Sequence, residues 1–168
     1  MVTIRRYQDE DLDALKEITV ESFRGVSIDE RIELAFGRIG GKDWRWRKAR
    51  HIDEDVAAHR EGIFVAVDGN RVVGYITSRI DPESKIGWIP NLAVRADYRG
   101  HGLGRRLMET CLDYLRSAGM EYAKIETLTC NEIGSRFYPS VGFREVARQI
   151  HYVKPLRDED SSSGEAST

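Results

Sequence analysis

Hydrophobic and polar residues change their spacing several times along the chain, and each change predicts a new element. Apolar residues that recur three or four positions apart predict helices, and these fall at residues 9–23, 27–39, 43–60, 103–118 and 131–141. Short apolar or alternating runs predict strands, and these fall at residues 2–7, 63–67, 71–80, 86–94, 122–128 and 145–153.

This order of elements predicts an α+β protein with a mixed, mostly antiparallel central sheet that is flanked by helices. Asp68-Gly69-Asn70 is a tight-turn signal, so the strands on either side of it are expected to form a hairpin. We expect a single domain over residues 1–156. Residues 157–168 are acidic and then rich in serine, which predicts a disordered tail.

Composition excludes several classes of protein. The chain is 40% hydrophobic and 32% charged, as is ordinary for a globular protein, and its net charge of −2 gives no basic excess for binding nucleic acid. No apolar run approaches the ~20 residues of a membrane span, and the N-terminus lacks the apolar core of a signal peptide. We therefore expect a cytoplasmic protein in which Cys111 and Cys130 are free thiols. His51, His59 and His101 follow no metal-ligand spacing, so no metal is expected.

Residues 99–104, Arg-Gly-His-Gly-Leu-Gly, carry the clearest chemical signal. Three alternating glycines leave the backbone uncovered, and a helix begins there, so its first N–H groups have no partner within the helix. Together with Arg99 and Arg105, these groups predict a site for a phosphate. Neither the dinucleotide pattern G-x-G-x-x-G nor the P-loop pattern fits. The alternative is a flexible glycine-rich turn.

The pattern R/Q-x-x-G-x-G/A does fit, as Arg99-x-x-Gly102-x-Gly104 after the strand that ends in Leu92-Ala93-Val94. It resembles the GCN5-related N-acetyltransferases (GNAT family). The resemblance implies an acyl-CoA N-acyltransferase fold, acetyl-CoA as co-substrate, and a loop that holds its pyrophosphate. The cofactor-binding residues that it implies are Leu92, Ala93, Val94, Arg99, Gly100, His101, Gly102, Leu103, Gly104, Arg105 and Asn131.

Pro90 interrupts the strand predicted at residues 86–94. Because proline has no N–H to give to a sheet, it marks an edge or a bulge in a strand. A bulge would splay this strand from the next and leave backbone groups unpaired. In the GNAT family such a splay lets the pantetheine arm pair with the strand, and the resemblance gives that role to Leu92, Ala93 and Val94. The alternative is that Pro90 marks only a sheet edge.

Glu126 and Tyr138 are the candidate catalytic residues. Strand alternation places Glu126 opposite Ile125, whose face is expected to lie under the glycine-loop helix. A carboxylate there could take a proton from an amine, although a salt bridge explains it equally well. Asn131 is a good helix N-cap. The block from Asn131 to Tyr138 resembles the family's second motif, in which the asparagine contacts pantetheine and the tyrosine protonates the departing thiolate.

The separation of twelve residues between Glu126 and Tyr138 resembles the ribosomal-protein N-terminal alanine acetyltransferases. Pro139 departs from the family pattern, because proline disfavours helical geometry at the residue before it. It therefore leaves open whether Tyr138 holds the acid position or is only a packing residue.

We expect an acetyl-CoA-dependent N-acetyltransferase whose partner is an amine-bearing acceptor, either a peptide N-terminus or a small molecule. A non-catalytic acyl-CoA sensor is the alternative, and a homodimer is expected by analogy with the family. Two groups of residues between positions 44 and 88 remain ambiguous. The basic run Arg45, Arg47, Lys48 and Arg50 is a solvated helix face or attracts an acidic acceptor. The tryptophans Trp44, Trp46 and Trp88 are core residues or line a pocket.

Overall fold

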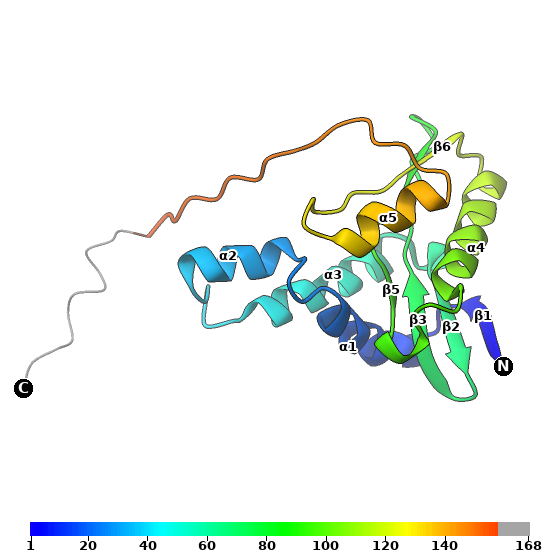
Figure 1. Ribbon diagram of the computed structural model, residues 1–168, viewed down its shortest axis with the longest axis horizontal. Coiled ribbons are helices and arrows are strands. Elements are labelled where there is room, and N and C mark those ends of the chain that lie inside the picture. The colour runs from blue at the N-terminus through cyan, green and yellow to red at the C-terminus, as the bar shows by residue number, and fades with distance from the viewer. Residues whose placement is uncertain (158–168) are drawn as a thin grey trace, which may run out of the picture.

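Antiparallel strands form the main sheet of the computed structural model, which describes residues 1–157 (Figure 1). Its strand order is β1 (Val2–Arg6), β2 (Phe64–Asp68), β3 (Arg71–Ile76) and β5 (Leu92–Val94). A second, two-stranded sheet pairs β4 (Ile86–Trp88) with β6 (Tyr122–Lys124) in parallel. A bridge between Arg79 and Trp88 joins the second sheet to the end of β3. The mixed, mostly antiparallel α+β architecture is therefore confirmed.

Helices cover both faces of the main sheet, as Figure 1 shows. They are α1 (Leu12–Ser22), α2 (Ile28–Phe36), α3 (Trp44–His59), α4 (Leu103–Ser117) and α5 (Glu132–Ser140), with 3₁₀ turns at Asp9–Asp11, Arg60–Gly62 and Ala96–Tyr98. Strand alternation decides which side chains meet which helices. Val65 and Val67 of β2 pack with α1 and α3, whereas Phe64 and Ala66 pack with α4.

The predicted core stripe of α4 is confirmed. Leu103, Leu107, Cys111 and Leu115 are all buried against the sheet. Burial raises the pKa of the Cys111 thiol to about 12, so this cysteine is an inert core residue. None of the helices within residues 1–157 is long and apolar enough to cross a membrane.

Two strand predictions need correction. The strand predicted at residues 122–128 ends at Lys124, and the one predicted at residues 145–153 does not form. The physical reason is the same in both cases, because a strand exists only where a neighbour takes its backbone hydrogen bonds. Residues 125–128 lose their neighbour where β5 turns towards β3, and residues 145–153 are exposed and extend away from the folded body (Figure 1). Residues 158–168, most of the predicted tail, lie outside the described residues.

Candidate active site

A gap opens between β5 and β6 at Pro90. Before Pro90 in the chain, β4 runs beside β6, and the Ile89 N–H donates to the Lys124 carbonyl at 3.0 Å. After it, the chain turns to pair with β3 alone, with Leu92 opposite Ile76 and Val94 opposite Gly74. The proline that cannot donate a hydrogen bond therefore stands where the two strands separate.

The residues of β5 divide into two sets along this gap. The Thr77 N–H donates to the Asn91 carbonyl at 2.9 Å, and the Arg95 N–H donates to the Val73 carbonyl at 2.8 Å. Since alternate residues of an antiparallel strand direct their backbone groups to the same side, Ala93 also directs its N–H and C=O to β3. Leu92 and Val94 therefore direct theirs into the gap.

Asn91 fixes the start of β5, and the sequence analysis missed it. The residue is 3% exposed. Its side-chain amide donates to the Asp55 carboxylate at 2.7 Å, and its side-chain oxygen accepts from Lys48 Nζ at 3.1 Å. Its own N–H donates to Thr77 Oγ1 at 3.1 Å. Buried α3 residues thus hold the strand in place where it leaves β6.

This contact corrects the interpretation of Lys48 as part of a solvated helix face, whereas Arg45 and Arg50 of the same run are exposed, as that interpretation expects. Lys48 is buried, which lowers the pKa of its ammonium group through desolvation, and Arg47 pairs with Asp29. Lys48 and Asp55 are seven positions apart on α3, so they share one helix face with buried Ile52. That spacing is the signal that could have identified them. Trp44 of the same helix is a core residue.

The glycine loop ends in an open helix N-terminus. Gly100 and Gly102 have φ values of +81° and +77°, and a Cβ added at either would meet open space. The first bond of α4 runs from the Arg106 N–H to the Gly102 carbonyl at 3.1 Å. The N–H groups of Leu103, Gly104 and Arg105 precede that bond, so no group within the helix accepts from them. They offer several donors and the positive end of the helix dipole to an anion.

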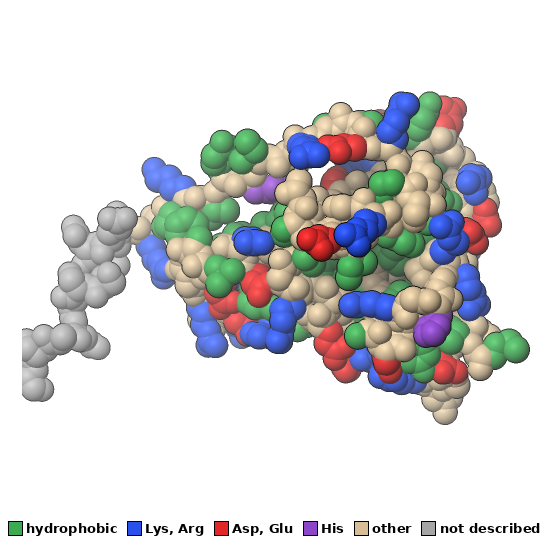
Figure 2. Space-filling view, in the orientation of Figure 1, with side chains coloured by type: hydrophobic (Ala, Val, Ile, Leu, Met, Phe, Trp, Pro, Cys, Tyr) green, Lys and Arg blue, Asp and Glu red, His purple; other side chains and the backbone are tan. Residues whose placement is uncertain are grey.

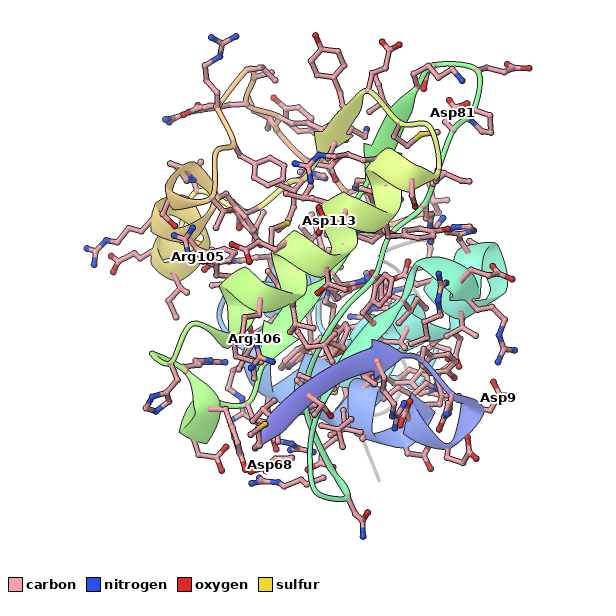
Figure 3. All side chains as sticks on the ribbon, turned by 90° about the vertical axis from the view of Figure 1, so that its right-hand side faces the viewer. Asp9, Asp68, Asp81, Arg105, Arg106 and Asp113 are labelled. Carbon is pink, nitrogen blue, oxygen red and sulfur yellow. The ribbon has the colours of Figure 1, made fainter. Side chains whose placement is uncertain are left out.

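Basic side chains surround this loop in different directions. Arg99 Nε donates to the Val94 carbonyl at 2.9 Å, which joins the loop to the open edge of β5. Arg105 reaches α5, where it donates to the Ser140 carbonyl, while Arg106 reaches β1 and donates to the Val2 carbonyl (Figure 3). His101 is exposed and lines a shallow cavity of about 460 Å³ beside Arg106. The loop is therefore flanked by positive charge.

Asn131 and Tyr138 are held together by α5. The predicted N-cap is confirmed, because Asn131 Oδ1 accepts from the Gly134 N–H at 3.0 Å, and its Nδ2 donates to Thr127 Oγ1 at 3.0 Å. The sequence analysis missed Gly134, although a Cβ there would lie 2.9 Å from Asn131 Nδ2 and 3.1 Å from Tyr138 Cε2. Only glycine leaves room for both side chains.

The helix continues through Pro139 to Ser140, so the proline does not break it at Tyr138. The Tyr138 ring packs edge-on against Phe137 and Phe143, at centroid distances of 5.5 and 6.1 Å. Burial raises the pKa of Tyr138 to about 12. Its hydroxyl therefore carries its proton throughout the neutral pH range.

Glu126 lies just beyond β6 and is the least enclosed of these residues. Its side chain is 61% exposed, and its carboxylate lies 3.5 Å from Lys124 Nζ. As predicted, Ile125 packs towards the α4 core, and Glu126 lies on the opposite, exposed side. No hydrogen bond or ion pair within residues 1–157 joins Glu126 to Tyr138.

The comparisons of this chain with known proteins point to one family. A sequence model of the Acetyltransferase (GNAT) family matches residues 12–143. An uncharacterized N-acetyltransferase of Archaeoglobus fulgidus is 29% identical over 84% of this chain and 92% of that protein. N-alpha-acetyltransferase 30 of Schizosaccharomyces pombe is 32% identical over 53% of this chain and 61% of that protein.

Solved structures share the fold at lower identity. The PaiA N-acetyltransferase of Thermoplasma acidophilum, solved in complex with coenzyme A, has a TM-score of 0.69 at 19% identity, with 86% of this chain and 90% of that chain covered. The ribosomal-protein-S18-alanine N-acetyltransferase of Escherichia coli has a TM-score of 0.64 at 21% identity, with 88% and 80% covered.

Proposed function

Because this chain belongs to the GNAT family of N-acetyltransferases and uses acetyl-CoA, we propose that its acceptor is the N-terminal amine of a peptide or protein. The observation that supports an acetyl-CoA site here is the open edge of β5. This edge leads from the point near Pro90 where the strands separate to the N-terminus of α4. One extended, anionic thioester has the shape and charge to follow such a path.

We assign the binding of acetyl-CoA to three groups of residues. The backbone groups of Leu92 and Val94 pair with the pantetheine arm, and Ala93 lies between them with its backbone held by β3. The loop from Arg99 to Gly104 and the N–H groups of Leu103, Gly104 and Arg105 bind the pyrophosphate. His101 lies within this loop, and Asn131 lies on the far side of the gap.

Glu126 and Tyr138 carry the proton transfers in this proposal. A nitrogen–carbon bond forms as the amine attacks the thioester carbonyl, and the carbon–sulfur bond breaks. The amine proton passes to Glu126, directly or through water, and the Tyr138 hydroxyl proton passes to the sulfur. Burial raises the pKa of a thiol as it does that of Tyr138, so a thiolate released there is basic enough to accept the proton.

The protein N-terminus is favoured over a small amine by two observations. Glu126 and Tyr138 are twelve residues apart, and this spacing resembles that of the ribosomal-protein N-terminal alanine acetyltransferases. About half of the chain, 53%, matches N-alpha-acetyltransferase 30 of Schizosaccharomyces pombe at 32% identity. The further expectation of a cytoplasmic protein remains part of this proposal.

A coenzyme A release assay with matched acceptors tests the proposal. The panel pairs peptides that have a free N-terminus with the same peptides blocked at the N-terminus, and adds polyamines and aminoglycosides as small amines. We expect release with free peptides only, and mass spectrometry should place one acetyl group on the α-amine. Release with small amines alone would contradict the proposed acceptor. Acetyl-CoA binding without any release would favour the sensor.

A further inference from the structure

The loop that leads into α5 touches α2 and the turn before it. Cys130 of this loop directly precedes Asn131, the residue that caps α5. The Arg31 guanidinium donates to Cys130 Sγ at 3.4 Å, and the Cys130 thiol donates to the Gly25 carbonyl at 3.9 Å. Figure 1 shows the start of α2 next to this loop, while Figure 2 shows basic side chains over the same part of the surface. Arg31 therefore lies beside the loop that borders the gap.

The charge of Arg31 is not neutralised by any carboxylate within residues 1–157. Its side chain is exposed, it takes part in no ion pair in this range, and its hydrogen bond goes to the Cys130 thiol, a weak acceptor. Residues three and four positions away on a helix share its face. At these positions stand uncharged residues: Ser27, Ile28, Leu34 and Ala35. Most of the five N–H donors of this guanidinium are therefore free for a carboxylate, which fits their fork geometry.

The region around Arg31 has an excess of positive charge. Residues 24–50 carry eight basic and four acidic side chains, although the whole chain has a net charge of −2. Each of the four carboxylates already has a partner in the same region: Asp29 pairs with Arg47, Glu30 accepts from the Gly25 N–H, Glu33 from the Trp44 N–H, and Asp43 from the Trp46 N–H. The region therefore favours an anionic ligand near Arg31.

Other cations near the gap are less available to a ligand. Lys124 and Arg79 each pair with a carboxylate, at 3.5 and 2.9 Å. Lys48 is buried. Arg24 is exposed and adds positive charge, but no hydrogen bond within residues 1–157 joins its side chain to the loop before α5. Arg31 is thus the cation that combines exposure with a contact to the border of the gap.

We propose that Arg31 binds a carboxylate of the acceptor, so that the enzyme prefers peptides with an acidic residue close behind the N-terminal amine. This inference rests on the proposed function, because it needs a peptide whose amine lies at Glu126. Glu126 is four residues before Cys130, and four residues of chain span at most about 14 Å. An extended acceptor covers that distance in about four residues. The carboxylate should therefore fall at roughly positions 2–5 of the acceptor.

Steady-state acetyl transfer to paired peptides tests this preference. Each pair has aspartate or asparagine at one of these positions, in an otherwise uncharged sequence with a free N-terminus. For at least one position, the aspartate peptide should have a KM lower by roughly three- to tenfold. Its kcat should be unchanged, because the contact is remote from the reacting atoms.

Two contrary results are distinguishable. Equal KM values for aspartate and asparagine at every position would overturn this inference and leave the peptide acceptor in place. Transfer to none of the peptides would contradict the proposed function, and this inference with it.

Two variants on one side of the molecule separate Arg31 from the general charge of the region. Arg38 follows α2, its side chain is 70% exposed, and it lies 3.9 Å from Glu33. Arg31→Gln and Arg38→Gln each remove one positive charge from the region. Arg31→Gln should abolish the aspartate preference, and Arg38→Gln should keep it. Arg31→Glu should reverse it, so that a peptide with lysine at the same position has the lower KM.

The preference must depend on Arg31 for the assignment to hold. A preference retained in Arg31→Gln, or an equal loss in Arg31→Gln and Arg38→Gln, would overturn it. Both side chains are exposed, so neither substitution should change the thermal unfolding midpoint by more than a few degrees, about the effect of 1 kcal/mol.

Discussion

At the scale of single residues, Tyr138 gives the sharpest test of the proton transfers. Tyr138→Phe keeps the ring between Phe137 and Phe143 and removes only the hydroxyl. Turnover should fall by roughly 10²–10⁴-fold, the usual contribution of a general acid, with acetyl-CoA affinity unchanged. Steady-state kinetics and calorimetry measure the two quantities. The control is Tyr122→Phe, which removes the hydroxyl of an exposed tyrosine on β6. If Tyr138→Phe were as active as this control, Tyr138 would be a packing residue and not the general acid.

The pH dependence of turnover separates the two candidate residues. Burial raises the pKa of Tyr138 to about 12, so its acidic form persists far above neutrality. We therefore expect no loss of kcat between roughly pH 8 and 10 from deprotonation of this group. Glu126→Gln should slow turnover and recover part of the rate as the pH rises, because more of the amine is then neutral. Tyr138→Phe should show no such recovery, and a parallel recovery in both variants would contradict the assigned roles.

Gly134 and Gly104 form a matched pair near the starts of two helices. Alanine at Gly134 would press on Asn131 and Tyr138, whereas alanine at Gly104 meets only the Phe137 ring at 3.6 Å, an ordinary contact. Gly134→Ala should lower the free energy of unfolding by about 0.5–2 kcal/mol, the value of an N-cap. Gly104→Ala should not destabilise the free protein, because alanine favours helix by about 1 kcal/mol. Urea unfolding of both variants measures their free energies of unfolding. A Gly134→Ala variant as stable as the wild type would contradict the prediction.

At the scale of elements, α3 holds the splayed strand through one buried carboxylate. Asp55 is 1% exposed and accepts hydrogen bonds from Asn91, Thr77 and Arg79 at 2.7–2.9 Å. Asp55→Ala leaves these groups unpaired, which should cost about 3–5 kcal/mol of unfolding free energy in urea titrations.

Asp53 provides the control on the same helix. It pairs with Lys16 at the surface, where its side chain is 45% exposed, so Asp53→Ala should cost no more than about 1 kcal/mol. Similar losses in the Asp53 and Asp55 variants would show that the buried network does not hold the helix to the strand.

Sequence patterns predicted the elements that depend on neighbours in the chain. The apolar stripe of α4, the turn at Gly69, the Asn131 cap and the break at Pro90 are all local signals, and the structure contains each of them. The contact between Asp55 and Asn91 joins residues 36 positions apart, which no local pattern encodes. The alternation at residues 145–153 shows strand character but not the identity of its partner, so a strand was predicted where the single chain has none.

At the scale of the whole molecule, the exposure of residues 144–157 predicts a pattern of protease sensitivity. Arg148 is a trypsin site on this exposed segment, whereas Arg95 is 8% exposed and donates hydrogen bonds to the Val72 carbonyl and to Glu17. Because a protease must bind its substrate as an open strand, we expect trypsin to cut the folded protein at Arg148 well before it cuts at Arg95. Mass spectrometry of the fragments over time measures this order. Cleavage at Arg95 as early as at Arg148 would contradict it.

The alternation along β5 also shapes which mutations this protein can accept. The groups that Leu92 and Val94 turn into the gap are peptide N–H and C=O groups, which nearly every amino acid supplies. A saturation library selected for activity should therefore retain many apolar residues at both positions. Proline alone lacks the N–H, so it should be depleted from both positions. The amino acids at positions 92 and 94 can therefore change during evolution, while the backbone groups that face the gap stay chemically the same.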